Sequence, residues 1–385
     1  MSLSMRSYIR SLLSSVITSA QEFRSAIGFT GTIQTGFVPV GQADGSIVWQ
    51  AQAGTVGGEG YPVWSAITSD TTASAGSAYS CENSSPITIT MPSPGYGNEI
   101  IIHRAHTGAV FIEPGSTKVN GLSVALVAVA SGAVIRCRYI DSTAGWAIDS
   151  QLVGWVPSSG LTQLMIAHKG VTHSGNSVSD WADQSGLGHN FAQSSSSNKP
   201  THSNTGFNGH PGIDFDGANN YMETADSADW NYTNQLVSMC VRIDNASAGE
   251  GQILSHSDAG SPYSGWNIRY NGGGSYPRKM GCRQGTSDYA DTGRGVIDGQ
   301  IHLIEIVRID GVCTQFYLDG LFNSEVGAAT ISDAATPLRV GCPSHTSSAA
   351  QFNGMLGGYA LFSSALTHDT REGIRKFWKF AFDIQ

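Results

Sequence analysis

The first hydrophobic pattern along the chain has a helical period. Between residues 5 and 27, apolar side chains recur at steps of 4, 3, 4, 3 and 4, at Ile9, Leu13, Val16, Ala20, Phe23 and Ile27. This is the spacing of a short coiled coil, and Gly28 can end the helix. So short a coil does not hold alone in water, so we expect it to pack on its own domain, to associate with copies of itself or to dock on a larger body.

The pattern then changes to the alternation typical of β-strands. After a Gly-, Gln- and Thr-rich stretch at 31–60, Ile87, Ile89 and Met91 alternate with threonines, and Asn120-Gly121 indicates a tight turn. We therefore predict an N-terminal helix and extended arm at 1–60, followed by a small all-β sandwich or barrel at 61–150.

Residues 151–385 show a second β-pattern that ends in a helix. Val237, Met239, Val241 and Ile243 alternate with other residues, and Asp319-Gly320 between two apolar runs predicts a hairpin. Thr367 can cap a C-terminal helix whose apolar face is formed by Ile374, Phe377, Trp378 and Ala381.

Composition supports an all-β fold. Only 13% of the 385 residues are charged, where a globular chain carries about 25%, and 47 residues are Gly. Gly disfavours helical bundles, whereas the 40% hydrophobic content excludes disorder. The net charge of −9 gives no basic excess for nucleic acid, and no apolar stretch reaches the roughly 18 residues of a membrane span.

The cysteines stand singly along the chain. None forms a C-x-x-C pair among Cys81, Cys137, Cys240, Cys282, Cys313 and Cys342. We expect buried free thiols in a protein made in a reducing cytoplasm. Disulfides among the last four would instead favour a secreted bacterial lectin.

Catalytic and metal motifs are weak. Asp214 and Asp216 have the i, i+2 spacing of a glycosidase pair, but the Phe215-Asp216-Gly217 run suggests a strand entering a turn. Both also offer calcium ligands, although turn capping accounts for them better. We therefore predict no enzyme and no cofactor, with calcium as a weak candidate, and keep a polysaccharide depolymerase using this pair as an alternative.

Aromatic residues in polar surroundings are the stronger signal. Sugar rings stack on such side chains, which makes glycan-binding candidates of Trp181, Tyr263, Trp266, Tyr270 and Tyr276. Several of them, Trp266 included, could equally face a core.

At 160–385 the chain resembles a laminin-G or concanavalin A-like jelly roll. The matching pieces, in order, are 178–186 (VSDWADQSG), 208–217 (NGHPGIDFDG), 316–320 (FYLDG) and 358–366 (GYALFSSAL). The resemblance implies two antiparallel sheets packed face to face, a tendency to bind carbohydrate and, in some members, a rim calcium. The catalytic glutamate signature of the hydrolases is missing, which favours a non-enzymatic member.

The front of the chain resembles bacteriophage fibre and decoration proteins. The similar pieces are 20–28 (AQEFRSAIG), 37–49 (FVPVGQADGSIVW) and the unit at 78–146, with 86–92 (PITITMP). The resemblance implies a trimer, which would give the N-terminal heptads their partners.

These observations favour a phage virion-surface protein, made in the bacterial cytoplasm. We expect the arm to dock on capsid or tail proteins and the terminal domain to adhere to host or environmental polysaccharide. A capsid decoration or head-fibre protein with a stabilising role is the alternative within that class.

Overall fold

The computed structural model describes residues 37–41, 47–51, 63–231, 234–244, 250–258, 264–271, 279–284, 287–290, 295–327, 331–346 and 350–384. The chain divides into two compact units, Met1–Tyr61 and Pro62–Gln385. In the first unit, β1 (Phe37–Gly41) and β2 (Ile47–Ala51) form an antiparallel pair. The predicted docking-helix residues Ile9, Leu13, Val16, Phe23 and Ile27 lie outside the described residues.

The second unit begins with a β-domain, residues 63–157, in which the chain passes back and forth between two sheets. Strands β3, β5 and β7 pair in parallel in one sheet, and β4, β6 and β8 pair in parallel in the other. From β3 to β8, successive strands therefore do not form hairpins, because each connection crosses from one set of parallel strands to the other. The strands are β3 (Trp64–Ile67), β4 (Thr71–Thr72), β5 (Ala78–Cys81), β6 (Ile87–Thr90), β7 (Glu99–Arg104), β8 (Val110–Glu113), β9 (Lys118–Val119), β10 (Leu122–Val129), β11 (Val134–Tyr139), β12 (Trp146–Ala147) and β13 (Val153–Pro157).

Alternation determines which side chains fill this first domain. Ile100 and Ile102 of β7 are buried, as are Ile87 and Ile89 of β6, and they meet in one hydrophobic cluster. The predicted turn at Asn120-Gly121 is confirmed, since both residues have positive φ (50° and 81°), which a tight hairpin of this kind requires.

The jelly roll follows, with its strands closed into a barrel. Its elements are β14 (Leu161–Ile166), β15 (Val171–Ser174), β16 (Ser177–Trp181), β17 (Phe191–Ala192), β18 (Thr201–Phe207), β19 (His210–Asp216), β20 (Met222–Thr224), β21 (Gln235–Ile243), β22 (Glu250–Ser257), β23 (Gly265–Asn271), β24 (Lys279–Gln284), β25 (Ser287–Ala290), β26 (Ile301–Ile309), β27 (Cys313–Leu318), β28 (Leu321–Gly327), β29 (Leu338–Val340) and β30 (Asn353–Phe362), with 3-10 turns η1 (Ser196–Asn198) and η2 (Ala228–Trp230) and helix α3 (His368–Ala381). The predicted all-β class with one C-terminal helix is confirmed.

The predicted hairpin lies between β27 and β28. Asp319 and Gly320 form its two-residue turn with φ of 54° and 83°. This is the geometry that an Asp-Gly pair favours.

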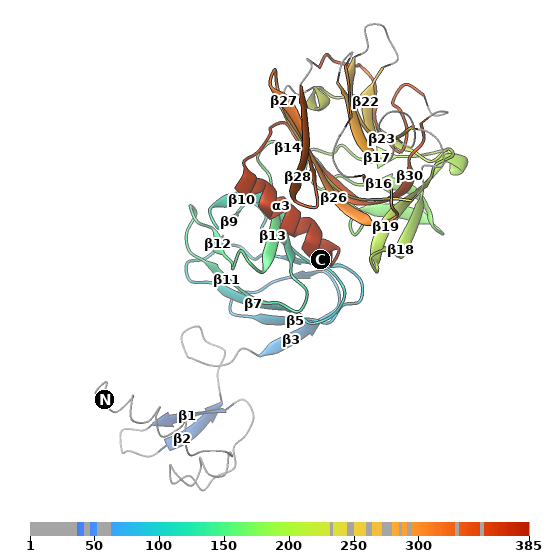
Figure 1. Cartoon of the computed structure of the whole chain (residues 1–385). Helices are drawn as coiled ribbons and strands as arrows, with labels where there is room; N and C mark the ends of the chain where they lie inside the picture. Colours follow the sequence, from blue (N-terminus) through green and yellow to red (C-terminus); the bar gives the residue numbers. More distant parts are fainter. Residues whose placement is uncertain are drawn as a thin grey trace. The chain divides into compact units, whose positions relative to one another are not determined.

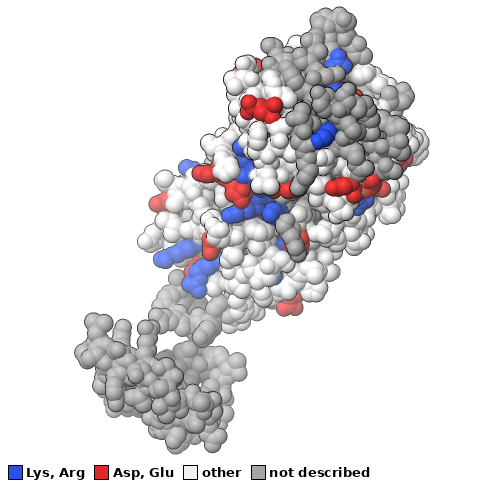
Figure 2. All heavy atoms as spheres, viewed as in Figure 1, with Lys and Arg blue, Asp and Glu red and all other residues white. Residues whose placement is uncertain are grey.

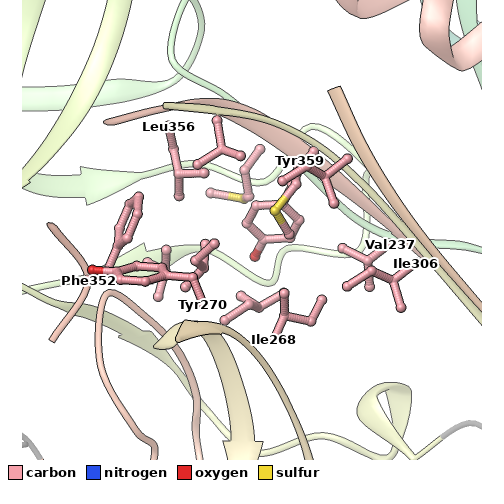
Figure 3. Packing of buried hydrophobic residues seen from close by; sticks show 14 of the residues in the cluster. Val237, Ile268, Tyr270, Ile306, Phe352, Leu356 and Tyr359 are labelled. Atoms are coloured by element: carbon pink, nitrogen blue, oxygen red, sulfur yellow. The ribbon is translucent and has the colours of Figure 1, made fainter. Parts of the chain in front are cut away.

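Strand β21 is buried on both faces. Val237, Met239 and Val241 enter the main core, which is packed between the layers of the jelly roll (Figure 3). Their neighbours Leu236 and Cys240 enter a second cluster on the opposite face. Alternate residues of β21 therefore face two different hydrophobic cores, rather than one core and the solvent.

Helix α3 provides the cover for that opposite face. Thr367 caps it by accepting a hydrogen bond from the backbone N–H of Thr370 at 3.3 Å, as predicted. The second cluster combines Phe377 and Trp378 of α3 with Phe111 of the first β-domain and with jelly-roll residues. Figure 1 shows α3 lying between β13 on one side and β26 and β28 on the other. The first β-domain and the jelly roll thus meet in a continuous hydrophobic junction that includes α3.

A buried guanidinium reinforces the junction. Arg104 of β7 is fully buried and donates to the carbonyls of Val129 (2.9 Å) and Phe380 (2.7 Å). It also forms an ion pair with Asp383 at 2.8 Å. The C-terminal residues are thereby bonded to the first β-domain.

Candidate functional site

Three of the predicted aromatic residues lie in the core rather than at the surface. Trp181 is 0% exposed, and Trp266 and Tyr270 are each 2% exposed. Each polar atom has a partner inside: Trp181 Nε1 donates to Ile166 O at 3.1 Å, Trp266 Nε1 donates to Trp230 O at 2.8 Å, and the Tyr270 hydroxyl accepts from Asn353 N at 2.9 Å. A ring with no free face cannot stack on a sugar.

The prediction that these three residues bind glycan is therefore wrong. Trp266, Ile268 and Tyr270 alternate along β23, which is the pattern of an inward face, and Tyr270 lies among the core residues of Figure 3. Tyr263 and Tyr276 lie outside the described residues.

Asp214 and Asp216 share one face of β19 but differ in surroundings. Asp216 accepts hydrogen bonds from the backbone N–H groups of Ala218 (2.9 Å) and Asn219 (3.2 Å), so turn capping is confirmed. Burial and the nearby Asp244 raise the pKa of Asp214, while Arg242 opposes the shift. Asp216 is exposed and holds its own turn through Oδ1, whereas Asp214 is half-buried.

A groove of mixed polar and apolar lining lies where the first β-domain meets the jelly roll. It has a volume of about 430 Å³ and is lined by hydroxyl, amide and backbone groups from both parts. The lining residues are Glu113, Gly115, Ser116, Thr117, Ser123, Val124, Ala125, Ser158, Gln184, Ser185 and Gly186.

The jelly-roll wall of this groove is held by one carboxylate. Asp183 accepts from the backbone N–H of Leu164 (2.9 Å) and Ser185 (2.8 Å), and from the Ser185 hydroxyl at 2.6 Å. The backbone N–H of His189 adds a fourth bond at 3.1 Å. The loop at 183–186 is therefore held in place before any ligand binds.

On the opposite wall, an ion pair across the junction neutralises the charge of Glu113. Glu113 of β8 lies 2.7 Å from Lys169 Nζ, which also donates to the Thr88 hydroxyl at 3.1 Å. Ser123 and Ser158 approach each other through a backbone hydrogen bond of 3.0 Å. Apart from Glu113, the residues that line the groove are uncharged. Figure 2 shows charged side chains scattered over a mostly uncharged face of the molecule.

A different set of residues could hold a metal. Among the described residues, Asp226, His256 and Asp333 form a group with ligand atoms within 4.8 Å of one another. Burial lowers the pKa of His256, and its hydrogen bond with Asp226 opposes that shift. Sequence analysis missed this group because its members come from three separate segments.

The cysteines agree with the sequence pattern. All six cysteines are buried free thiols, and burial raises the pKa of Cys81 and Cys137 to about 12. The structure therefore gives no disulfide framework of the kind a secreted lectin would use. In the described part of the chain, no helix has the length and apolar character needed to span a membrane.

The architecture at the C-terminal end has a match among known families. Residues 216–370 match the concanavalin A-like lectin/glucanases superfamily. The predicted jelly roll of this type is thereby confirmed for that segment. No curated protein matches the chain.

Several solved structures are distantly similar. The sialidase of Trypanosoma rangeli in complex with sialic acid is 12% identical, with a TM-score of 0.44, covering 74% of this chain and 46% of the sialidase. The binding domain of Paraclostridial Mosquitocidal Protein 1 is 12% identical, with a TM-score of 0.43, covering 57% of this chain and 52% of that domain. The matched regions span about half the length of each of these structures.

The prediction that the chain is not an enzyme is wrong as an exclusion. The superfamily that residues 216–370 match takes in glucanases as well as lectins. The missing glutamate signature, on which the prediction rested, does not exclude catalysis.

Proposed function

We propose that this protein binds polysaccharide through the unit at residues 62–385. The observation that carries the proposal is the match of residues 216–370 to a superfamily of lectins and glucanases. The groove between the two β-domains supplies a binding surface of suitable chemistry, because sugar hydroxyls pair with serine hydroxyls, amides and backbone groups.

The electrostatics of the groove favour a neutral glycan. The carboxylate of Glu113 is paired with Lys169, so a sugar bound there would meet little net charge. Because Asp183 already holds the loop at 183–186 in place, glycan binding there would not cost the entropy of ordering the loop.

Glycan-array binding and calorimetry on the full chain test this proposal. The double variant Ser123→Ala/Ser158→Ala removes two exposed groove hydroxyls, and loss of two hydrogen bonds predicts affinity lower by about tenfold or more. Ser159→Ala removes a neighbouring exposed hydroxyl outside the groove and should leave affinity unchanged. If the folded protein binds no polysaccharide, glycan binding is refuted; if the double variant binds as well as the wild type, the groove is not the site.

We further propose that the protein is displayed on a bacteriophage particle as a homotrimer, with its N-terminal arm docked on capsid or tail proteins. This part rests on the resemblance of 20–28, 37–49 and 78–146 to phage fibre and decoration proteins. Gold-labelled antibody on intact particles should mark discrete sites on the head or tail, and ultracentrifugation should give three chains per complex. Particles without label would contradict the virion role, and a monomer would contradict the trimer.

A further inference from the structure

Three strands bring distant polar residues to one end of the jelly-roll sheet. Strand β29 pairs with β20 on one side and with β22 on the other, with Thr224 opposite Leu338 and Ser255 opposite Arg339. Asp226 follows β20, His256 lies at the end of β22, and Asp333 precedes β29. Antiparallel pairing therefore places all three residues at the same edge.

Their ligand atoms converge. His256 Nε2 lies 3.1 Å from Asp226 Oδ1, and the nitrogen and the two carboxylates can all lie within 4.8 Å of one another. The His256 side chain is 0% exposed, whereas both aspartates are exposed. The group thus has a buried nitrogen at its base and two carboxylates open to solvent.

Unpartnered buried atoms around this group are a separate observation. Asn231 Oδ1 and Thr336 Oγ1 are buried and have no hydrogen-bond partner. They belong to the same place, because Asn231 interacts with the Asp333 carboxylate and the Thr336 backbone interacts with the His256 ring. Buried polar atoms in native proteins are normally satisfied, and a bound ion is one of the ways in which they are.

We propose that Asp226, His256 and Asp333 bind Zn²⁺. One imidazole nitrogen with two carboxylate oxygens is a mixed donor set that suits zinc, whereas Ca²⁺ takes six to eight oxygen ligands. Three protein ligands leave a fourth tetrahedral position for water.

The bound ion would add a further link between segments whose strands already pair in the sheet. The segment after β20, the end of β22 and the approach to β29 would share one centre, which would hold this end of the barrel together. This site does not depend on the glycan-binding groove, which is lined by other residues.

The test uses the full chain after treatment with EDTA. Elemental analysis and calorimetry with Zn²⁺ should show one ion bound per chain, and the unfolding temperature should rise with Zn²⁺ by more than with equal Ca²⁺. Co²⁺ in place of Zn²⁺ should give the visible absorption of a tetrahedral site.

Variants locate the ion. Asp226→Asn and Asp333→Asn alter exposed side chains without changing their size, and each should weaken Zn²⁺ binding by tenfold or more while leaving circular dichroism unchanged. Asp229→Asn changes a nearby carboxylate that pairs with His189 instead, and it should bind Zn²⁺ like the wild type. The proposal is overturned if the wild type takes up no Zn²⁺, if it binds Ca²⁺ more tightly, or if both Asn variants bind as well as the wild type.

Discussion

Arg375 of α3 and Glu305 of β26 form an ion pair of 2.6 Å that is closed off from solvent. The side chains are 5% and 1% exposed, and Arg371, one helical turn earlier, lies 3.6 Å from the same carboxylate. Arg371 also stacks over the Tyr317 ring, 4.3 Å from its centroid. The C-terminal helix is thus fixed to the jelly-roll sheet by charge as well as by its apolar face.

Breaking this pair should destabilise the protein strongly. In Glu305→Gln the guanidinium of Arg375 keeps its burial but loses its main counter-charge, and loss of one partner of a buried pair costs about 3–5 kcal/mol. The other partner of Arg375, Glu372, is half exposed, so Glu372→Gln should cost less than about 1 kcal/mol. Urea unfolding of both variants measures the difference; equal midpoints for Glu305→Gln and the wild type would contradict a stabilising role for the pair.

Close packing of α3 on β13 should make one glycine irreplaceable. A Cβ atom at Gly154 would lie 1.9 Å from the backbone nitrogen of Phe377, so the helix would have to move away from the strand. We expect Gly154→Ala to cost about 1–3 kcal/mol, the range for overpacked cores. Gly327→Ala is the matched control, because a Cβ there has no neighbour within 4 Å and the backbone φ is not positive. Comparable losses in both variants, measured by urea unfolding, would show that the helix is not seated against Gly154.

Local periodicity explains which parts of the fold could be predicted. The apolar face of α3 and the Asp319-Gly320 turn depend on residues close in sequence, so their patterns were sufficient. The parallel pairing of β3, β5 and β7 depends on which distant strand each one meets, and no local pattern encodes that choice.

The candidate sites were harder to predict than the fold. The sequence around Trp266 is rich in polar residues, yet Trp266 shares the inward face of β23 with Ile268 and Tyr270. Its ring is therefore part of the core, whatever the polarity of the residues next to it in sequence. Asp226, His256 and Asp333 have no spacing signal, because the pairing of β29 with β20 and β22 brings them together.

The planar guanidinium of Arg104 should be essential for stability, so lysine should not be able to replace it. Its nitrogens reach Gly108 O (3.0 Å), Val129 O, Phe380 O and the Asp383 carboxylate, and a lysine ammonium cannot reach this set of acceptors. Arg104→Lys should therefore leave buried acceptors unsatisfied and cost about 2–4 kcal/mol. Arg136→Lys, at an exposed surface pair with Glu99, should change stability by less than about 0.5 kcal/mol. Denaturation curves that coincide for the two variants would rule out the bridging role.

A buried histidine at the domain junction should make stability fall in mild acid. Both ring nitrogens of His168 are buried without a partner, and its ring lies 4.4 Å from that of Phe382 and 5.6 Å from that of Phe111. Burial, followed by the nearby His210 and Arg104, holds the pKa of His168 well below 6.5. Below pH 6.5 the unfolded chain therefore takes up a proton that the folded chain refuses.

This difference in protonation has a definite sign. The contribution of His168 to folding is fully present above pH 6.5 and is lost as the pH falls toward the folded-state pKa, by about 1.4 kcal/mol at pH 5.5. His168→Phe keeps an aromatic ring without the titrating group, so relative to the wild type it should gain about that amount between pH 8 and pH 5.5. His106→Phe, at an exposed histidine, should show no such gain. Urea unfolding at both pH values decides the matter, and a His168→Phe curve that shifts with pH in parallel with the wild type would show that His168 is protonated in the folded state.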